Sequence, residues 1–340
     1  MHQWAPPKIK LDYDNVGLLV GDQEQDVSRI LVCLDVTEQV VDEAIEKQCE
    51  LIVSHHPLIF KQISRINPTN EQGRILYKLI RNNIALFTAH TNLDAALDGV
   101  SFILANNLGL DELQFLERNY SVSRKITLTT AFEDSEAVLK LLNYYSAEEA
   151  HFFSVDGRKE GLKCFEAIID AHNVMPLKNT LEREGLLKKG SFQELEMASP
   201  SNNFGLGVMG HYPEDGIAQN EFLHLVCRAL EVSAIKYSGE VKRIRKVAVC
   251  GGAGVFLKKS AIAAGADAYI TSDIKYHEYF TEKENFLLVD VGHYESEFPV
   301  VEAIRKELTE GFEDLEVIAT QTITNPVKIY STEFENKTIQ

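Results

Sequence analysis

The sequence predicts an α/β fold with two similar halves, each containing a βαβ unit, and a smaller α+β domain inserted between them. Apolar strands alternate with helical segments near both ends of the chain, and Cys33 to Ser54 spans the same distance as Cys250 to Thr271, 21 positions. Runs that are apolar throughout and joined by helices are typical of parallel strands buried on both faces. The middle of the chain has short alternating strands instead, which indicates a separate domain.

The first half is predicted to cover residues 1–122. Its elements are a strand at 30–34, a helix at 38–48, a strand at 51–54 and a strand from 83 to 89. Val40, Val41 and Ala44 share one face of the helix, which is the face expected to pack on the sheet.

The second half is predicted to cover residues 200–340 and to repeat the same order of elements. These are a strand at 246–250, a helix at 255–264, a strand at 267–271 and a strand that begins near residue 285. In open parallel sheets, ligands bind beyond the carboxyl ends of the strands. Polar residues that follow these strands are therefore the first candidates for a site.

The inserted domain is predicted to cover residues 123–199. Strands are expected at 125–132, 151–155, 162–171 and 192–197, with helices at 135–145 and 176–185. Pro176 and Gly185 are the start and stop signals of the second helix. The order β-α-β-β-α-β is the ferredoxin-like pattern.

Composition excludes several classes of protein. The 340 residues carry a formal net charge of −17, which argues against a nucleic-acid binder or a binder of anionic membranes. No apolar run approaches the ~20 residues that span a bilayer. The five cysteines are scattered and never spaced C-x-x-C, so they predict neither disulfides nor a zinc–thiolate site. The cytosol is the expected compartment.

Two dissimilar segments end alike. One apolar strand runs into His90-x-x-x-Asp94, and another runs into His293-x-x-x-Glu297. Residues at i and i+4 of a helical turn share a face, so each segment is expected to aim an imidazole and a carboxylate in the same direction.

A third strand ends in the adjacent pair His55-His56, followed by Pro57. Consecutive strand side chains point to opposite faces, so this pair can face one pocket only if the strand has already ended. Imidazole and carboxylate ligands suit Zn, Mn, Fe or Co, and a carboxylate can bridge two ions. The histidines and carboxylates together predict a dinuclear metal site.

Two glycine-rich stretches are candidates for phosphate-binding loops. Residues 205–210 match G-x-G-x-x-G, but an Asn-rich loop precedes them and His-Tyr-Pro follows, so we interpret them as a flexible return to the main domain. Gly251 and Gly252 follow a strand and open a helix, where backbone N–H groups could hold an anion such as a phosphate. Close packing of strand and helix would also require small residues there.

These residues resemble the NIF-three-like family of dinuclear-metal proteins, often labelled GTP cyclohydrolase I type 2 homologs. The matching stretches are residues 13–22, 54–60, 90–94, 265–277 and 291–297. The resemblance implies two divalent ions per chain (Zn, Mn or Fe) and a toroidal homohexamer capped by a PII/CutA-like insert. The ligands that it implies are His55, His56, Asp94, His293 and Glu297. It places Asp35, His90, Asp273 and His277 along the pocket.

The chain departs from the family pattern in two places. The family begins with a helix, whereas residues 2–7 stand where that helix should be ending, so the start is misassigned or the fold lacks an element. The insert lacks the Gly-rich turn with an aromatic residue and Arg-Pro that bacterial members often carry.

The expected function is metal-dependent hydrolysis of a small molecule, either a nucleotide or a phosphate ester. His90, Asp273 and His277 are the candidates for proton transfer, because they lie at or just past strand ends. Gly251 and Gly252 would contact the substrate's phosphate. The alternative is a hexameric assembly without enzymatic activity that stores, delivers or senses metal, or regulates a partner.

Overall fold

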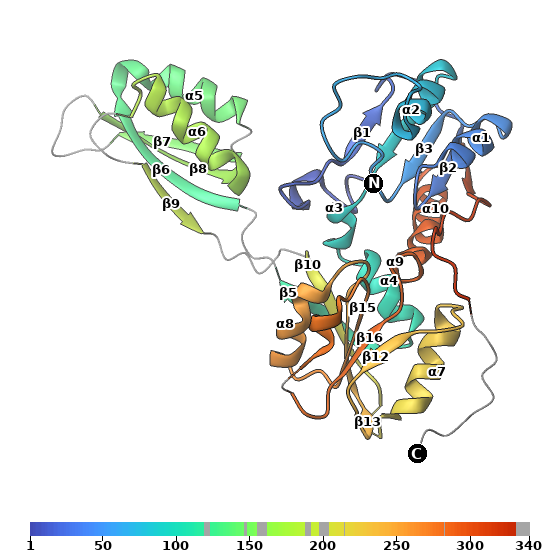
Figure 1. Ribbon diagram of the computed structural model, residues 1–340. Coiled ribbons are helices and arrows are strands. Elements are labelled where there is room, and N and C mark those ends of the chain that lie inside the picture. The colour runs from blue at the N-terminus through green and yellow to red at the C-terminus, as the bar shows by residue number, and fades with distance from the viewer. Residues whose placement is uncertain are drawn as a thin grey trace. The chain divides into compact units, whose positions relative to one another are not determined.

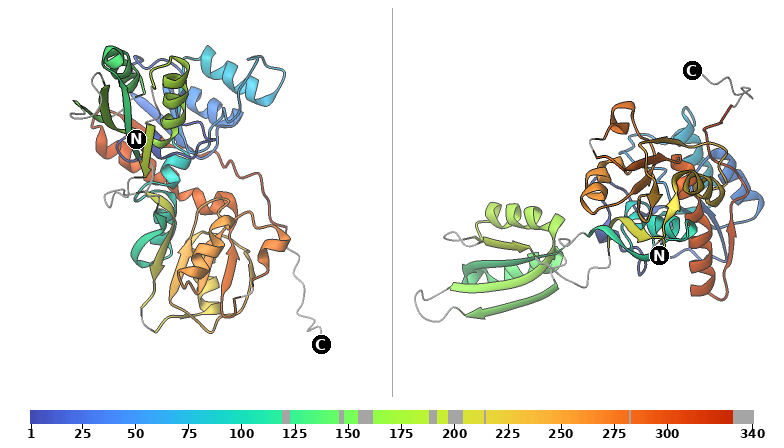
Figure 2. Two further views of the ribbon diagram at one scale, coloured as in Figure 1. Left: turned by 90° about the vertical axis from the view of Figure 1, so that its left-hand side faces the viewer. Right: turned by 90° about the horizontal axis from the view of Figure 1, so that it is seen from below.

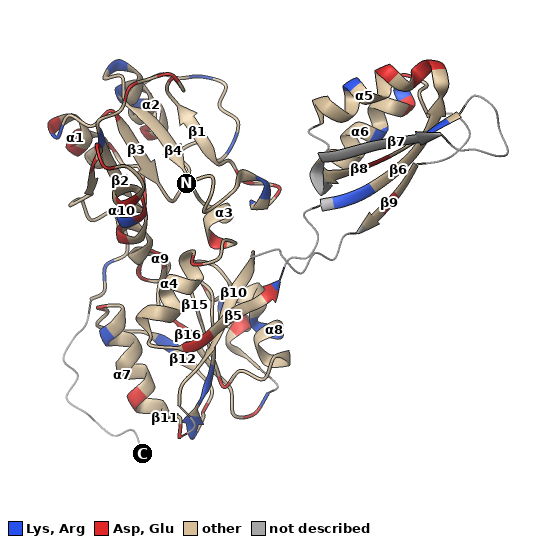
Figure 3. Cartoon of the chain, turned by 180° about the vertical axis from the view of Figure 1, so that it is seen from behind, with Lys and Arg blue, Asp and Glu red and all other residues tan. Residues whose placement is uncertain are grey.

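The computed structural model describes residues 1–118, 123–145, 148–154, 162–187, 192–196, 204–213, 215–281 and 283–330. The chain divides into two compact units, one formed by residues 1–117 with 204–340 and the other by residues 118–203 (Figure 1). The larger unit contains two main sheets, called here the first and second sheet. Acidic residues outnumber basic ones, 51 to 34, and both kinds are spread over many elements (Figure 3).

The first sheet has the strand order β1-β4-β3-β2-β17. Its strands are β1 (Gly17–Val20), β2 (Arg29–Cys33), β3 (Leu51–Ser54), β4 (Ala85–Thr88) and β17 (Glu316–Ala319). All neighbours pair in parallel except β1, which runs antiparallel to β4 at one edge. The strands β2 to β4 are joined by α1 (Glu38–Glu46) and α2 (Glu71–Arg81). Both helices start at side-chain caps, Thr37 and Asn70, which accept backbone N–H groups of the first turn.

The second sheet has the strand order β12-β16-β15-β14-β10-β5. Its strands are β5 (Asp111–Arg118), β10 (Gly205–His211), β12 (Lys236–Ser238), β14 (Lys246–Val249), β15 (Ala268–Thr271) and β16 (Leu287–Asp290). The three central strands β14 to β16 are parallel. The helices α4 (Val100–Asn107), α7 (Gln219–Ala229) and α8 (Lys258–Ala263) belong to this part of the unit.

The shared spacing of 21 residues has a structural basis. Cys33 is the register partner of Ser54 in the first sheet, and Val249 is the partner of Ile270 in the second, an offset of 21 in both pairs. The predicted helix at 255–264 is shorter than expected, because its first turn, Val255–Leu257, is a 3₁₀ turn that precedes α8. The strands themselves lie where the sequence predicts them.

Each sheet also includes, or is packed against, elements that lie far from its other strands in the sequence. α4 and β5 follow the first sheet in sequence, yet α4 packs on β10 and β14, and β5 is the edge strand of the second sheet. Conversely, α10 (Pro299–Gly311) and β17 follow the second sheet in sequence but pack on β2 of the first (Figures 1 and 2). This exchange of elements was not predicted.

The interpretation of residues 205–210 as a flexible return was wrong, because they form β10, an inner strand paired with β14. The glycines are needed because β5 lies very close. A Cβ on Gly210 would lie 2.7 Å from Leu113 Cδ2, and a Cβ on Gly205 would lie 2.3 Å from the Glu117 carbonyl oxygen. The match to G-x-G-x-x-G therefore reflects strand packing.

The smaller unit contains its own four-stranded antiparallel sheet, ordered β7-β8-β6-β9. Its elements are β6 (Ser123–Ala131), α5 (Ser135–Tyr144), β7 (Glu148–Ser154), β8 (Leu162–Asp170), α6 (Ala171–Arg183) and β9 (Phe192–Glu196), which gives the order β-α-β-β-α-β. Leu128, Phe165 and Leu177 lie in its core. Helix α6 begins before Pro176, which lies inside the helix and removes one backbone hydrogen bond, so the predicted start at Pro176 was wrong.

Among the described residues, none of the helices combines the length and the apolar character that crossing a bilayer requires.

Candidate metal centre

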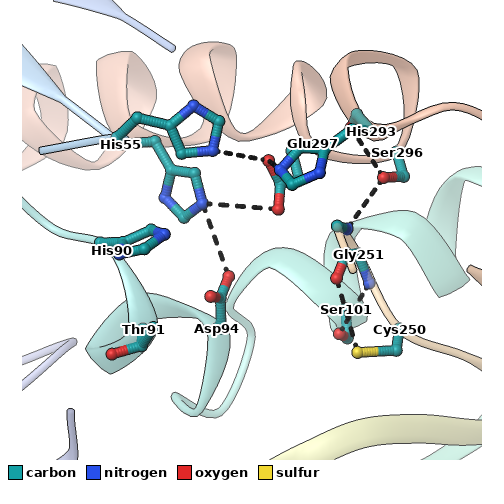
Figure 4. Close-up of polar contacts among 12 residues, drawn as sticks. His55, His90, Thr91, Asp94, Ser101, Cys250, Gly251, His293, Ser296 and Glu297 are labelled. Atoms are coloured by element: carbon teal, nitrogen blue, oxygen red, sulfur yellow. Dashed lines mark hydrogen bonds and ion pairs between the residues drawn. The ribbon is translucent and has the colours of Figure 1, made fainter. Parts of the chain in front are cut away.

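Imidazoles and carboxylates from segments far apart in the sequence point toward one another (Figure 4). They come from residues that follow the parallel strands of both sheets. His55 and His56 follow β3, and their backbone N–H groups continue the strand pairing by donating to the carbonyls of Cys33 and Leu34. His90 follows β4, and Asp94 ends the short helix α3 (Thr91–Asp94). From the second sheet, α9 (His293–Glu297) follows β16 and supplies its first and last residues.

His55 and Asp94 face each other through two buried atoms that lack a hydrogen-bond partner. The His55 Nδ1 lies 2.8 Å from the Ala89 carbonyl oxygen, so it carries the proton and leaves a lone pair on Nε2. That Nε2 lies 3.5 Å from Asp94 Oδ1 and 3.9 Å from Glu297 Oε1. Among the described residues, His55 Nε2 and Asp94 Oδ1 are both buried and unpaired. Unpaired buried acceptors are costly, and a shared cation would satisfy both of them.

His56 and His293 hold the other oxygen of Glu297. Their Nε2 atoms lie 2.9 and 3.0 Å from Glu297 Oε2. Glu297 is 3% exposed, so its charge is compensated by these imidazoles rather than by water.

The described residues form three groups in which all candidate ligand atoms lie within 4.8 Å of one another. They are His55, Asp94 and Glu297; His56, His293 and Glu297; and His55, His56 and His90. The residues therefore fit a divalent cation both in type and in spacing. Glu297 belongs to two of the groups.

The Nδ1 atoms of His56 and His293 are each held by a carboxylate. Asp35 Oδ1 lies 2.7 Å from His56 Nδ1, and Asp273 Oδ2 lies 2.7 Å from His293 Nδ1. Such carboxylate partners fix the orientation of an imidazole ligand. Asp273, predicted as a proton-transfer group, thus contacts a candidate ligand directly.

His90 is held in the same way by Asp14. Asp14 Oδ1 lies 2.9 Å from His90 Nδ1, while its Oδ2 accepts the backbone N–H and the hydroxyl of Thr91. Burial alone would raise the pKa of the Asp14 carboxyl, but the hydrogen bonds from His90 and Thr91 outweigh it and lower that pKa. Asp14 has no role in the sequence-based prediction, because a single acidic residue in a loop gives no signal of burial.

The imidazoles differ in protonation because their surroundings differ. Burial lowers the pKa of His55 to about 3. Burial opposes the charge of His56 too, but hydrogen bonds to Asp35 and Glu297 raise its pKa to about 10. The hydrogen bond to Glu297 is the main cause that raises the pKa of His293 to about 9. Without metal at pH 7, His55 is therefore neutral while His56 and His293 are charged.

The carboxyls of the centre also differ. Burial, followed by the charge of Glu297, raises the pKa of Asp94 well above its usual value. Burial alone would raise the pKa of Glu297 too, but its hydrogen bonds with His293 and His56 outweigh burial and lower that pKa. The centre thus holds one firmly ionised carboxylate at its middle.

Gly251 and Gly252 border the centre. The N–H of Gly251 donates to the Ser101 hydroxyl, and the N–H of Gly252 donates to the Ser296 hydroxyl. Contact with an anion through these amides stays a prediction. A Cβ on Gly252, which has a φ of +63°, would lie 2.1 Å from Glu297 Oε1. Gly252 therefore leaves the space in which the Glu297 carboxylate lies.

His277, the remaining predicted residue, lies outside the three groups of ligand atoms. It is exposed in the 3₁₀ turn Tyr276–Tyr279, and its ring centroid lies 5.2 Å from that of Tyr276. A role for His277 in proton transfer stays a prediction.

We expect Gly252→Ala to reduce metal affinity about 10- to 100-fold, as loss of supporting contacts at metal ligands typically does. The added methyl group would displace the Glu297 carboxylate. Gly109→Ala is the matched control, because Gly109 has a similar φ of +68° but no atom within 4 Å of the place that its new methyl group would take. Zinc titration of both variants measures the difference, and equal affinities would contradict this role of Gly252.

We expect zinc uptake by the metal-free protein at pH 7 to release about two protons or more per chain. His56 and His293, with pKa values of about 10 and 9, must each lose a proton from Nε2 to bind a cation, whereas His55 is already neutral. Zinc affinity should therefore fall as pH falls. Calorimetry in buffers of different ionisation enthalpy counts the protons, and release of fewer than one would contradict the expectation.

The chain matches known proteins over nearly its whole length. The profile of the Duf34/NIF3 (NGG1p interacting factor 3) family matches residues 1–326. A Staphylococcus epidermidis protein called GTP cyclohydrolase 1 type 2 homolog is 32% identical, over 93% of this chain and 94% of that protein. A Listeria innocua protein of the same name is 31% identical, over 86% of each.

Solved structures agree with these matches. A Bacillus cereus protein related to NIF3 has a TM-score of 0.70 and 28% identity, over 97% of this chain and 96% of that one. A Staphylococcus aureus protein has a TM-score of 0.72 and 29% identity over the same shares. The chain therefore belongs to the Duf34/NIF3 family.

Proposed function

We propose that the chain binds two divalent ions, with Glu297 as the bridging ligand. The observation that carries this proposal is the position of Glu297 between two sets of ligands. Its Oε1 faces His55, while its Oε2 faces His56 and His293. Asp94 completes the first set, so His55, Asp94 and Glu297 would hold one ion and His56, His293 and Glu297 the other.

We further propose that this centre hydrolyses a nucleotide or a phosphate ester. When bound, the ions would supply Lewis-acid activation of water and of the attacked group. Three protein ligands per ion leave positions for water and substrate, as catalytic sites do. The name of the relatives contains GTP, and a nucleotide is one of the two substrate classes proposed here.

His90 is the proposed proton-transfer residue. Its Nδ1 donates to Asp14, so the neutral ring keeps a lone pair on Nε2 that can accept a proton. Its ring centroid lies 5.3 Å from that of His55 and 5.5 Å from that of His56, which puts it beside both sets of ligands. Asp14 is the positioning residue that holds the ring.

The homohexamer and the PII/CutA-like character of the insert are also proposals. Exposed aromatic side chains support the first, because exposed apolar surface often marks an interface between proteins. Tyr13, Tyr276 and Phe280 are 64%, 72% and 64% exposed in the single chain.

Metal content tests the dinuclear centre. We expect about two ions per chain in the purified protein after incubation with Zn, Mn or Fe, and about one or fewer in Glu297→Ala, because both sets lose a ligand. Glu310→Ala is the control, since Glu310 is an exposed residue at the end of α10. Elemental analysis gives the counts. Two ions retained in Glu297→Ala would exclude a bridging role.

Turnover of a generic phosphoester tests hydrolysis. We expect metal-loaded protein to hydrolyse bis(4-nitrophenyl) phosphate or 4-nitrophenyl phosphate, and His90→Gln to lower kcat about 10²- to 10⁴-fold with unchanged metal content. Asp14→Asn should lower kcat less and shift the pH profile, because it acts through His90. Full metal content without hydrolysis of either ester would favour a metal-binding assembly.

A further inference from the structure

A cavity of about 510 Å³ lies directly beside the candidate metal centre. The imidazoles of His56 and His293 line one end of it, together with their partners Asp35 and Asp273. Small-molecule sites typically enclose about 300–1,000 Å³. The cavity therefore has the size of a ligand site and opens onto the ligands of the metal.

Apolar side chains form most of the wall away from the metal centre. Val232 and Ile235, between α7 and β12, and Val291, after β16, are among them. A mainly apolar wall with few polar groups is typical of a site that binds an organic molecule.

Part of the wall comes from the C-terminal strap, defined here as residues 320–330. Thr320 and Thr322 donate to Glu43 on α1, and Thr324 donates to Asp35 Oδ2 at 2.6 Å. Asn325 Nδ2 then donates to Glu295 Oε1 on α9 at 2.8 Å. Beyond Asn325, the strap lines the cavity with Pro326, Val327 and Ile329.

Carboxylates are the most numerous charged groups of the cavity. Four carboxylates line it, those of Asp35, Asp273, Asp290 and Glu295. Among the described residues that line it, Lys236 is the one lysine or arginine, and its Nζ lies 3.4 Å from Asp290 Oδ2. An anionic group placed in the cavity would meet this acidic wall, whereas a cationic group would be attracted.

Of the four carboxylates that line the cavity, that of Glu295 has an oxygen left to accept a hydrogen bond from a ligand. Asp35 and Asp273 already hold histidines, and Asp290 accepts from the Tyr279 hydroxyl and from Lys236. In the described part of the chain, Glu295 accepts one hydrogen bond, from Asn325 to Oε1, which leaves Oε2 for a donor from the ligand.

We propose that this cavity binds the organic part of the substrate, and that this part is an apolar group carrying an amine or similar cationic nitrogen that pairs with Glu295. The proposal rests on the proposed metal centre in one respect: the reacting group of the substrate would lie at the end of the cavity that His56 and His293 line. A phosphate of the substrate would stay at that end, because bound metal ions would attract its charge.

Two probes of equal shape and different charge test the proposal. 4-Fluorobenzylamine and 4-fluorobenzyl alcohol are titrated into zinc-loaded and metal-free protein and followed by ¹⁹F NMR. We expect the amine to bind about 10-fold more tightly than the alcohol, because a charge-assisted hydrogen bond is stronger than a neutral one. Glu295→Gln should remove most of this preference, since the amide still accepts from Asn325 but has no charge.

Ala234→Trp tests the location, because Ala234 is an exposed residue on the cavity wall and an indole there would fill the space. We expect it to weaken both probes, whereas Ala264→Trp, exposed at the end of α8, should weaken neither. Equal affinity for the two probes, or equal loss of both in Glu295→Gln, would overturn the charge preference. Unchanged binding in Ala234→Trp, or no binding of either probe, would overturn the site. Since the assay needs neither metal nor turnover, its failure is distinguishable from failure of the proposed function.

Discussion

The structure around the centre depends on one buried carboxylate, that of Glu297. A buried charge is costly unless it is paired and hydrogen-bonded, and Glu297 meets this requirement through imidazoles from two different sheets. The requirement extends outward, because His56 and His293 are themselves held by Asp35 and Asp273. Gly252 must also lack a side chain for the carboxylate to fit. The positions of the surrounding side chains thus follow from the need to compensate the buried charge of Glu297.

The same centre joins two sheets whose strands end at a common point. Ligands in parallel sheets collect at the carboxyl ends of strands, and here β3 and β4 of the first sheet meet β16 of the second in this way. Asp14 and Asp35 contribute from loops next to the first sheet. The cavity beside His56 and His293 lies at the same junction. Residues of both parts of the unit and of the C-terminal strap line it. The candidate metal ligands and the cavity therefore lie at one junction between the two sheets.

Local pattern accounts for much of this arrangement. The strands, the offset of 21 residues and the meeting of His55, His56, Asp94, His293 and Glu297 follow from apolar runs that end in polar residues. Other features carry no local signal. The pairing of β17 with β2 joins Glu316 to Arg29, and nothing near either residue indicates the other. The role of residues 205–210 depends on how closely β5 approaches, and the role of Asp14 depends on burial by segments distant in sequence.

The exchange of elements between the sheets has a consequence for how the protein is made. The first sheet lacks β17, one of its two edge strands, until residue 319 has left the ribosome, because β17 is the last described strand of the chain. Contacts between such distant segments are slow to form, since loop closure costs entropy before the contact stabilises anything. Glu297 and its partner His56 also come from segments 241 residues apart in the sequence. A nascent chain can therefore assemble the complete set of candidate ligands only after Glu297 has been made.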